Sequence, residues 1–196
     1  MNGLTRHDAW TLLTEWVQSP GLRRHCHAVE TAMRAYAEKR GESVEAWGLV
    51  GLIHDFDYER HPDLAEHPFV GARVLREHGY PGWVVDAILS HADVPQYPRR
   101  TDMEKTLFAV DELTGFISAV ALVRPSKAVK EVKPSSVKKK MKDKRFAEGI
   151  HREDLVRGAE ELGVPFDDNL AFVIQAMAAN ANALGLAGVE SQSVGS

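Results

Sequence analysis

Cysteine is almost absent from this 196-residue chain: Cys26 is the only one, which excludes a framework of internal disulfide bonds. Such sparing use of cysteine is typical of proteins from a reducing compartment. No apolar run approaches the length of about 18 residues that a membrane helix needs. The first ten residues, MNGLTRHDAW, also lack the basic and then apolar pattern of a secretory signal. We therefore expect a cytoplasmic protein without a membrane-spanning segment.

The sequence has equally little that predicts β-structure, since no sustained alternation of apolar and polar residues occurs. Apolar residues instead recur at helical spacing, between capping residues and terminating glycines. Helices are expected at residues 5–17, 22–40, 43–54, 68–78, 81–91, 101–122, 152–162 and 168–184, with shorter helical pieces at 126–132 and 136–144. The sequence thus predicts an all-α helical bundle that forms a single domain over residues 1–186, followed by a flexible tail at 187–196.

Positive charge is concentrated in one segment. Residues 124–145 contain ten Lys or Arg and two acids, so this segment carries +8 within a chain of net charge −4, and the rest carries −12. Arg124, Lys127 and Lys138 are candidates for binding the phosphate of a substrate. A solvated lysine surface is the alternative. A nucleic-acid surface would need aromatic residues among the Lys and Arg side chains. Only Phe146 is close by, which disfavours a nucleic acid as the partner.

Six residues have the side chains that bind Zn, Mn or Fe in proteins, and several interrupt apolar runs where an unpaired polar group is costly. They are His25, His54, Asp55, His67, His91 and Asp111. His54 and Asp55 are consecutive, so they can share one ion only where a helix ends. The two oxygens of Asp55 could also bridge two ions. His27 lies two residues from His25 and faces roughly 200° away on a helix, so it is not expected to be a ligand.

Each of these residues has a simpler interpretation when taken alone. A single histidine in an apolar run is more often a hydrogen-bonded core residue than a ligand, and a His-Asp dipeptide is common. Asp57 and Glu59 are candidates for an acid or base behind the ligands, with solvated loop charges as the alternative. Asp55 and Asp57 are the residues that we expect to be catalytic. The set of six is far more specific than any one of its members.

The order H…HD…D resembles the HD superfamily of metal-dependent phosphohydrolases. LRRHCHAVETAMRAYAEKRG is similar to the first ligand helix of that family, GLIHDFDYE to its HD motif and LFAVDELTGF to its last aspartate motif. HPFVGARVLREHGYP and AILSHAD resemble the additional histidine motifs of the dinuclear HDIG-type branch. The whole chain resembles a bacterial group of predicted HD hydrolases. This resemblance implies an HD-domain helical bundle with its metal-site core in residues 20–122, further helices at 124–186, and one or two divalent ions (Mn, Fe, Mg or Zn).

The resemblance also implies a function. The chain is expected to be a phosphomonoesterase or phosphodiesterase for a small phosphorylated molecule such as a nucleotide. It departs from the HDIG pattern at Phe56-Asp57-Tyr58, which stand where the pattern has Ile-Gly-Lys. Two alternatives stay open. A dinuclear iron oxygenase shares the order H…HD…H…H…D, and a metal-binding regulatory module without catalysis would need the same ligands. The oligomeric state is left open.

Overall fold

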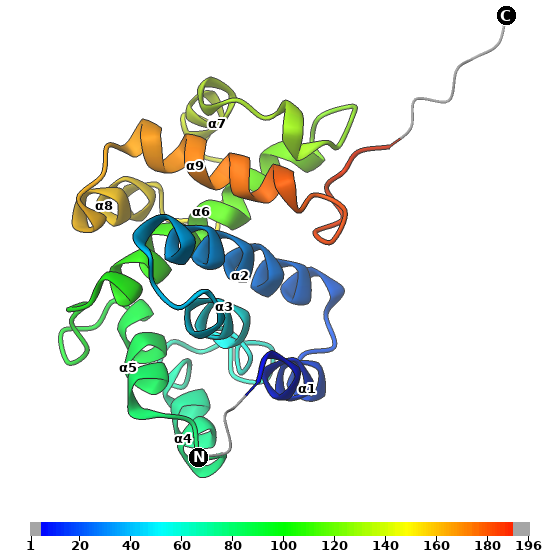
Figure 1. Cartoon of the computed structure of the whole chain (residues 1–196). Coiled ribbons are helices and arrows are strands. Elements are labelled where there is room, and N and C mark those ends of the chain that lie inside the picture. Colours follow the sequence, from blue (N-terminus) through cyan, green and yellow to red (C-terminus); the bar gives the residue numbers. More distant parts are fainter. Residues whose placement is uncertain (1–4, 190–196) are drawn as a thin grey trace, which may run out of the picture.

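A computed structural model describes residues 5–189 of the chain, and helices account for all the regular secondary structure in this range (Figure 1). The all-α prediction is confirmed, because the described residues contain only one isolated β-bridge, between Ala128 and Ala187. The elements are α1 (Arg6–Trp16), α2 (Pro20–Arg40), α3 (Val44–Ile53), α4 (Phe69–Glu77), α5 (Gly82–His91), α6 (Asp102–Leu122), the 3₁₀ helix η1 (Val129–Glu131), α7 (Pro134–Met141), α8 (Arg152–Leu162) and α9 (Phe166–Ala179).

Local capping residues set many of the helix boundaries. At the start of α6 the Thr101 hydroxyl accepts a hydrogen bond from the Glu104 amide, and the Glu104 carboxylate accepts one from the Thr101 amide. These two bonds satisfy amide groups that a helix start leaves unpaired. Gly41 follows α2 with φ of 71°, a left-handed conformation that glycine adopts without a steric penalty. The expected helices therefore start and end close to their predicted positions through residue 122.

The two longest helices, α2 and α6, form the centre of the bundle. Helix α2 packs against α3, α6 and α9, while α6 also packs against α5 and α8 (Figure 1). The buried Tyr36 hydroxyl donates to Asn169 at 2.6 Å, and the Asn169 amide donates to the Ala109 carbonyl at 3.3 Å, which connects α2, α9 and α6. A Cβ atom added to Gly158 would lie 2.7 Å from the Ala109 Cα atom. Helices α6 and α8 are thus in backbone contact, and glycine permits it.

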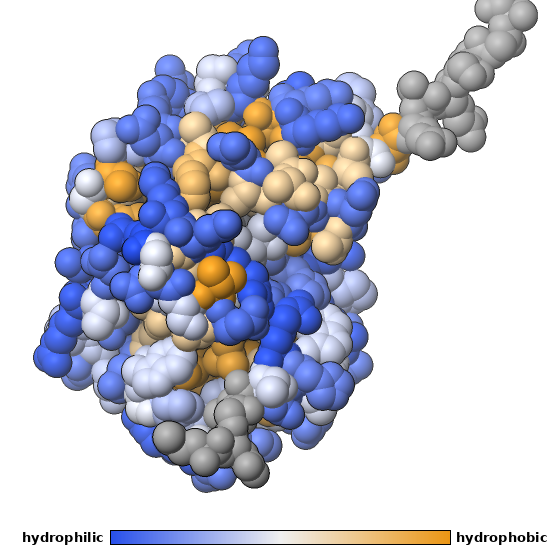
Figure 2. Space-filling model, in the orientation of Figure 1, coloured by the Kyte–Doolittle hydropathy of each residue, from blue (hydrophilic) through white to orange (hydrophobic). Residues whose placement is uncertain are grey.

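Figure 2 shows a mostly hydrophilic face, with the apolar residues gathered mainly over α9. Among the described residues, no helix combines the length and the apolar character that crossing a bilayer requires.

Beyond α6 the structure differs from the sequence expectation in several places. Of the helical piece expected at 126–132 only η1 forms, α7 begins and ends earlier than the expected piece at 136–144, and α9 ends at Ala179. The predicted tail is also partly held, since the Val189 amide donates to the Ser126 carbonyl at 2.9 Å beside the Ala128–Ala187 bridge. Backbone pairing between distant segments accounts for this order. Residues 190–196 of the predicted tail lie outside the described residues.

Candidate metal centre

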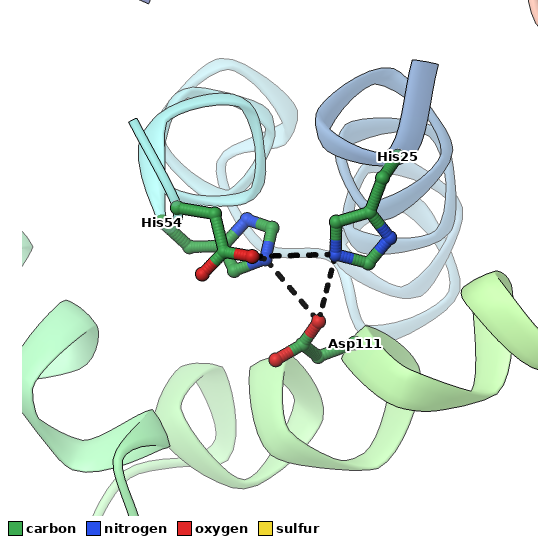
Figure 3. Close-up of side chains that lie close together, drawn as sticks. His25, His54 and Asp111 are labelled. Carbon is green, nitrogen blue, oxygen red and sulfur yellow. Dashed lines mark hydrogen bonds and ion pairs between the residues drawn. The ribbon is translucent and has the colours of Figure 1, made fainter. Parts of the chain in front are cut away.

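Three of the expected ligands come from three neighbouring helices. His25 lies near the start of α2, His54 caps the C-terminus of α3, and Asp111 lies in the middle of α6; Figure 3 shows them pointing toward one another. After His54 the chain leaves the helix for a series of turns over residues 54–60. This helix end allows His54 and Asp55 to face the same point, as the sequence predicts.

The ligand atoms of these residues form the first of two groups. His25 Nε2 lies 3.0 Å from Asp111 Oδ1 and 3.6 Å from Asp55 Oδ2. His54 Nε2 lies 3.2 Å from Asp111 Oδ1 and 3.4 Å from Asp55 Oδ2. Two imidazole nitrogens and two carboxylate oxygens thus surround one point, in a donor set that suits Zn, Mn or Fe.

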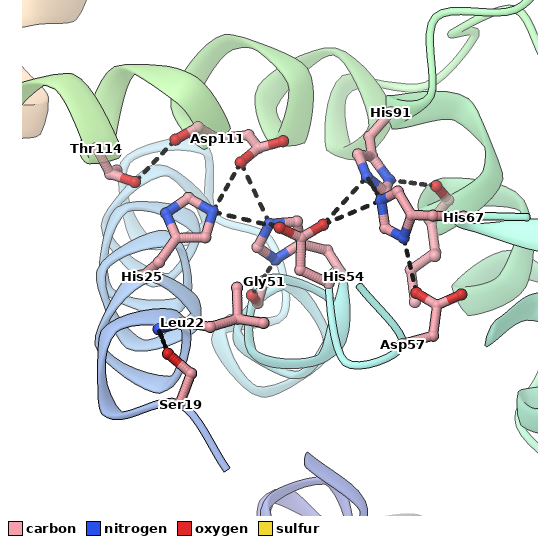
Figure 4. Close-up of polar contacts among 12 residues, drawn as sticks. Ser19, Leu22, His25, Gly51, His54, Asp57, His67, His91, Asp111 and Thr114 are labelled. Atoms are coloured by element: carbon pink, nitrogen blue, oxygen red, sulfur yellow. Dashed lines mark hydrogen bonds and ion pairs between the residues drawn. The ribbon is translucent and has the colours of Figure 1, made fainter. Parts of the chain in front are cut away.

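The second group lies on the other side of Asp55. Nε2 of His67 and Nε2 of His91 are 3.2 Å apart, and they lie 3.3 Å and 3.4 Å from Asp55 Oδ1. Figure 4 shows His67 and His91 on one side of the centre and His25 and Asp111 on the other. The structure therefore brings all six expected residues together, with one oxygen of Asp55 facing each group.

The hydrogen bonds of the imidazole rings indicate that both groups fit a cation. Nδ1 of His54 donates to the Gly51 carbonyl at 2.9 Å, and Nδ1 of His91 donates to the Ile88 carbonyl at 2.5 Å. Nδ1 of His67 faces a carboxylate oxygen of Asp57 at 2.8 Å. A neutral imidazole whose hydrogen is on Nδ1 presents a lone pair at Nε2. In that state the inward-facing atoms are lone pairs beside anionic oxygens, an arrangement that a divalent ion stabilises.

Without an ion, the carboxylates favour protonated imidazole rings, so a bound metal would displace these protons. Burial of His54 opposes its positive charge, but the charges of Asp55 and Asp111 outweigh burial and raise the pKa of His54 well above its usual value. Burial likewise opposes the charge of Asp55, and His54, His67 and His91 nevertheless lower the pKa of this carboxyl well below its usual range. Burial also opposes the charge of Asp111, and His54 and His25 nevertheless lower its pKa. Asp55 and Asp111 are thus both held ionised, which is the state that binds a metal.

The ligand side chains differ in their exposure to solvent. The side chains of His25, Asp111 and Asp55 are 22%, 16% and 14% exposed, whereas that of His54 is fully buried. His67 and His91 are each 6% exposed. Asp55, which belongs to both groups, is thus among the ligands that solvent reaches.

Asp57, the other residue expected to be catalytic, lies behind His67 and is almost completely buried. Its side chain is 1% exposed. One oxygen accepts from His67 Nδ1 at 2.8 Å (Figure 4). The other accepts from the Gly71 amide at 2.7 Å. Burial opposes the charge of His67, but hydrogen bonds with Asp55 and Asp57 raise its pKa to about 9. Asp57 is thus a positioning residue that orients His67.

Glu59, the second candidate for an acid or base, has a structural role. Its Oε2 atom accepts hydrogen bonds from the amides of Gln18 and Ser19, at 2.9 Å and 2.8 Å, just before α2. His27 also follows expectation in facing away from the ligands, since it contacts Glu30 and the ring of Trp10. Neither Glu59 nor His27 belongs to the group of possible ligands.

The structure does not bring the three basic candidates to the centre. Helix α6 continues without a break from Asp111 to Leu122, so Arg124 lies about 20 Å of helical rise beyond Asp111. Arg124 pairs with Glu131, and Lys138 donates to Asp167 of α9 at 2.8 Å. Lys127 also makes no ion pair with a ligand residue within 5–189. The observed partners of Arg124 and Lys138 are thus acidic residues outside the metal centre.

A different part of the chain, the segment between α7 and α8, lies near His25. A Cβ atom on Gly115 would lie 3.7 Å from Ile150 Cδ1 and 3.8 Å from His25 Nδ1, so the segment between α7 and α8 reaches the turn of α6 after Asp111. In the same region the His151 amide donates to the Glu112 carboxylate at 3.1 Å. Burial and the charge of Asp111 raise the pKa of Glu112 to about 7. No local pattern in the sequence indicates this contact, because tertiary packing creates it.

Comparison with known families identifies the part of the chain that carries the centre. The HD domain family matches residues 22–114. Residues 22–114 are an HD domain. This domain includes all six residues, from His25 on α2 to Asp111 on α6, in an arrangement positioned to bind a metal ion. HD domains are typical of metal-dependent hydrolases. No curated protein and no solved structure matches the chain closely enough to add a relative.

Proposed function

We propose that this HD-domain protein is a metal-dependent phosphohydrolase that acts on a small phosphorylated molecule. The proposal rests above all on Asp55, whose two oxygens face two different histidine groups. Asp55 would thus contribute one oxygen to each of two ions, and two-metal sites serve many phosphatases and nucleases. The first ion would be held by His25, His54, Asp111 and Asp55, and the second by His67, His91 and Asp55.

The chemistry depends on what such ions supply. When bound, two divalent ions withdraw charge from a phosphoryl group and lower the pKa of a coordinated water molecule. The protein itself fixes the direction of the ligand atoms: helix carbonyls hold His54 and His91, and Asp57 holds His67. Preorganised ligands of this kind cost no reorganisation when the substrate binds.

The exposure of the ligands and their number in each group also suit the binding of a phosphoester. Asp55, Asp111 and His25 form the exposed part of the centre, while His54 is closed off by the protein. The second group has only three protein ligands, one fewer than the first. This leaves more coordination positions free for the substrate and for water on the His67 and His91 side, which is what catalytic metal sites retain.

The test is turnover of a panel of phosphomonoesters and phosphodiesters by protein purified without oxygen and loaded with either Mn²⁺ or Fe²⁺. We expect hydrolysis with the redox-silent metal and its loss in Asp55→Ala. Reaction only with iron and O₂ would favour an oxygenase, which uses the same ligand order. Tight metal binding without turnover of either substrate class would favour a regulatory module.

Glu59→Gln is the matched control for this test, because Glu59 lies on the same loop as Asp55 and does not face the ligands. It should retain both the bound metal and the hydrolytic rate. Equal rates in wild type and Asp55→Ala would show that any hydrolysis comes from another source and would contradict the proposal.

A further inference from the structure

Tyr58 is the first exposed side chain after the His54-Asp55 pair. Phe56 and Asp57 are fully buried, whereas Tyr58 is 41% exposed. Its ring lies 5.1 Å from the ring of His67, at an angle of 83°. This T-shaped contact places an exposed aromatic ring one side-chain width from the nitrogen that would hold the second ion.

The backbone on both sides of Tyr58 is held in place. The Tyr58 amide donates to the Asp55 carbonyl at 3.1 Å, and Asp57 is fixed by His67 and Gly71. On the other side Glu59 accepts the two amides before α2, and Arg60 donates to the Glu15 carbonyl at 2.6 Å. Tyr58 is therefore an aromatic ring presented to solvent by a rigid segment, as binding surfaces require.

The hydroxyl of Tyr58 forms no hydrogen bond with the rest of residues 5–189. Neither burial in the core nor a hydrogen bond of the hydroxyl thus explains why position 58 carries a tyrosine. The available interaction is the ring surface itself, beside a centre that would bind a phosphoryl group. A flat, apolar group attached to that phosphoryl group is the partner that such a ring recognises, because planar rings stack on aromatic side chains.

We propose that Tyr58 is a specificity-determining residue, whose ring stacks on a planar aromatic group carried by the phosphorylated substrate. This inference rests on the proposed function and deepens it, since it names the substrate class as aromatic phosphoesters. Because the Tyr58 ring contacts His67 directly, the planar group would lie on the His67 side of the centre. Both aryl phosphates and nucleoside monophosphates carry such a group, and the experiment separates the two sources.

The experiment measures binding, so that it does not depend on turnover. Phenylphosphonate and methylphosphonate are titrated by calorimetry into the Mn²⁺-loaded wild type and into Tyr58→Leu and Tyr58→Phe. We expect the wild type and Tyr58→Phe to bind phenylphosphonate about tenfold more tightly than methylphosphonate, as one aromatic stack provides. Tyr58→Leu should lose this preference while its Mn²⁺ content and its affinity for methylphosphonate stay unchanged.

A second arm compares a nucleoside 5′-monophosphate with ribose 5-phosphate in the same variants. A Tyr58-dependent preference in this pair supports stacking on a nucleobase, whereas a preference limited to phenylphosphonate supports stacking on a small aryl group. Trp83→Leu is the matched control. Trp83 is 46% exposed and lines an apolar cavity of about 490 Å³ at the opposite ends of α3 and α5 from the ligands, so its loss should change neither comparison.

The inference is overturned if the wild type shows no preference in either pair, or if Tyr58→Leu keeps the preference of the wild type. Failure of the proposed phosphohydrolase function would give a different result from failure of the Tyr58 inference. In that case no phosphoester is hydrolysed, while phenylphosphonate still binds more tightly than methylphosphonate only when residue 58 is aromatic.

Discussion

Replacement of Asp57 by asparagine changes one oxygen into an amide and leaves the size of the side chain almost unaltered. In the native protein two donors, His67 Nδ1 and the Gly71 amide, use two different oxygens of Asp57. Asparagine has a single acceptor oxygen, and its NH₂ group is itself a donor. One of the two buried donors must therefore lose its partner in Asp57→Asn.

The magnitude follows from the burial of these groups. A buried donor without a partner costs about 1–3 kcal/mol, so the free energy of unfolding of the metal-free protein should fall by that amount. Loss of the carboxylate behind a ligating histidine lowers metal affinity by about 10- to 100-fold. We expect this loss at the ion held by His67 and His91, with the ion held by His25 and Asp111 affected far less.

Metal affinity is measured by competition with a chelator, and stability by urea unfolding of the chelated protein. Glu59→Gln is the matched control, because one oxygen, Oε2, accepts both amide hydrogen bonds and the glutamine carbonyl can accept them equally well. Asp57→Asn with wild-type affinity for both ions would refute the positioning role of Asp57. So would an equal loss of affinity in Glu59→Gln.

Three further predictions concern close packing and charge. Gly71→Ala should reproduce the metal defect of Asp57→Asn, because its Cβ atom would lie 2.7 Å from Asp57 Cγ; metal counting checks this. Gly158→Ala should lower the free energy of unfolding by about 1–3 kcal/mol in a urea titration, since the new Cβ would press on the Ala109 backbone without touching the metal centre. Burial opposes the charge of Glu30, but hydrogen bonds from cationic neighbours outweigh it and lower its pKa to about 2, against 4.5 in the unfolded chain. Its contribution to stability is therefore complete above about pH 5 and is lost as the pH falls toward 2, so Glu30→Gln should destabilise the protein at pH 6 much more than at pH 2 in urea titrations at both values.

Much of the fold is predictable from the sequence because the determining signals are local. The Thr101–Glu104 capping box and Gly163 at the end of α8 each involve residues a few positions apart, and the structure uses both as expected. The convergence of the six ligand-type residues is predictable for a different reason. Polar groups such as His91 and Asp111 within apolar runs need a partner, and the ligand chemistry of these residue types indicates a common one.

Other features depend on contacts between distant segments and are not visible in the sequence. Asp57 looks like a loop acid until Gly71, fourteen residues later, is placed against its carboxylate. The positive charge of Arg124 indicates an anion site, but the uninterrupted length of α6 carries it away from Asp111. Ile150 instead lies beside Gly115, one turn of α6 after Asp111, through packing that no spacing in the chain predicts.

The most direct test of the proposed dinuclear centre is the number of ions bound per chain in wild type and His67→Ala. Both proteins are loaded with Mn²⁺ without oxygen and freed of excess metal. His67 belongs only to the second group, so its loss should leave the ion held by His25, His54, Asp111 and Asp55 in place. The account predicts two ions per chain in the wild type and one in His67→Ala. One ion in both proteins, with equal hydrolysis of a phosphoester, would contradict it.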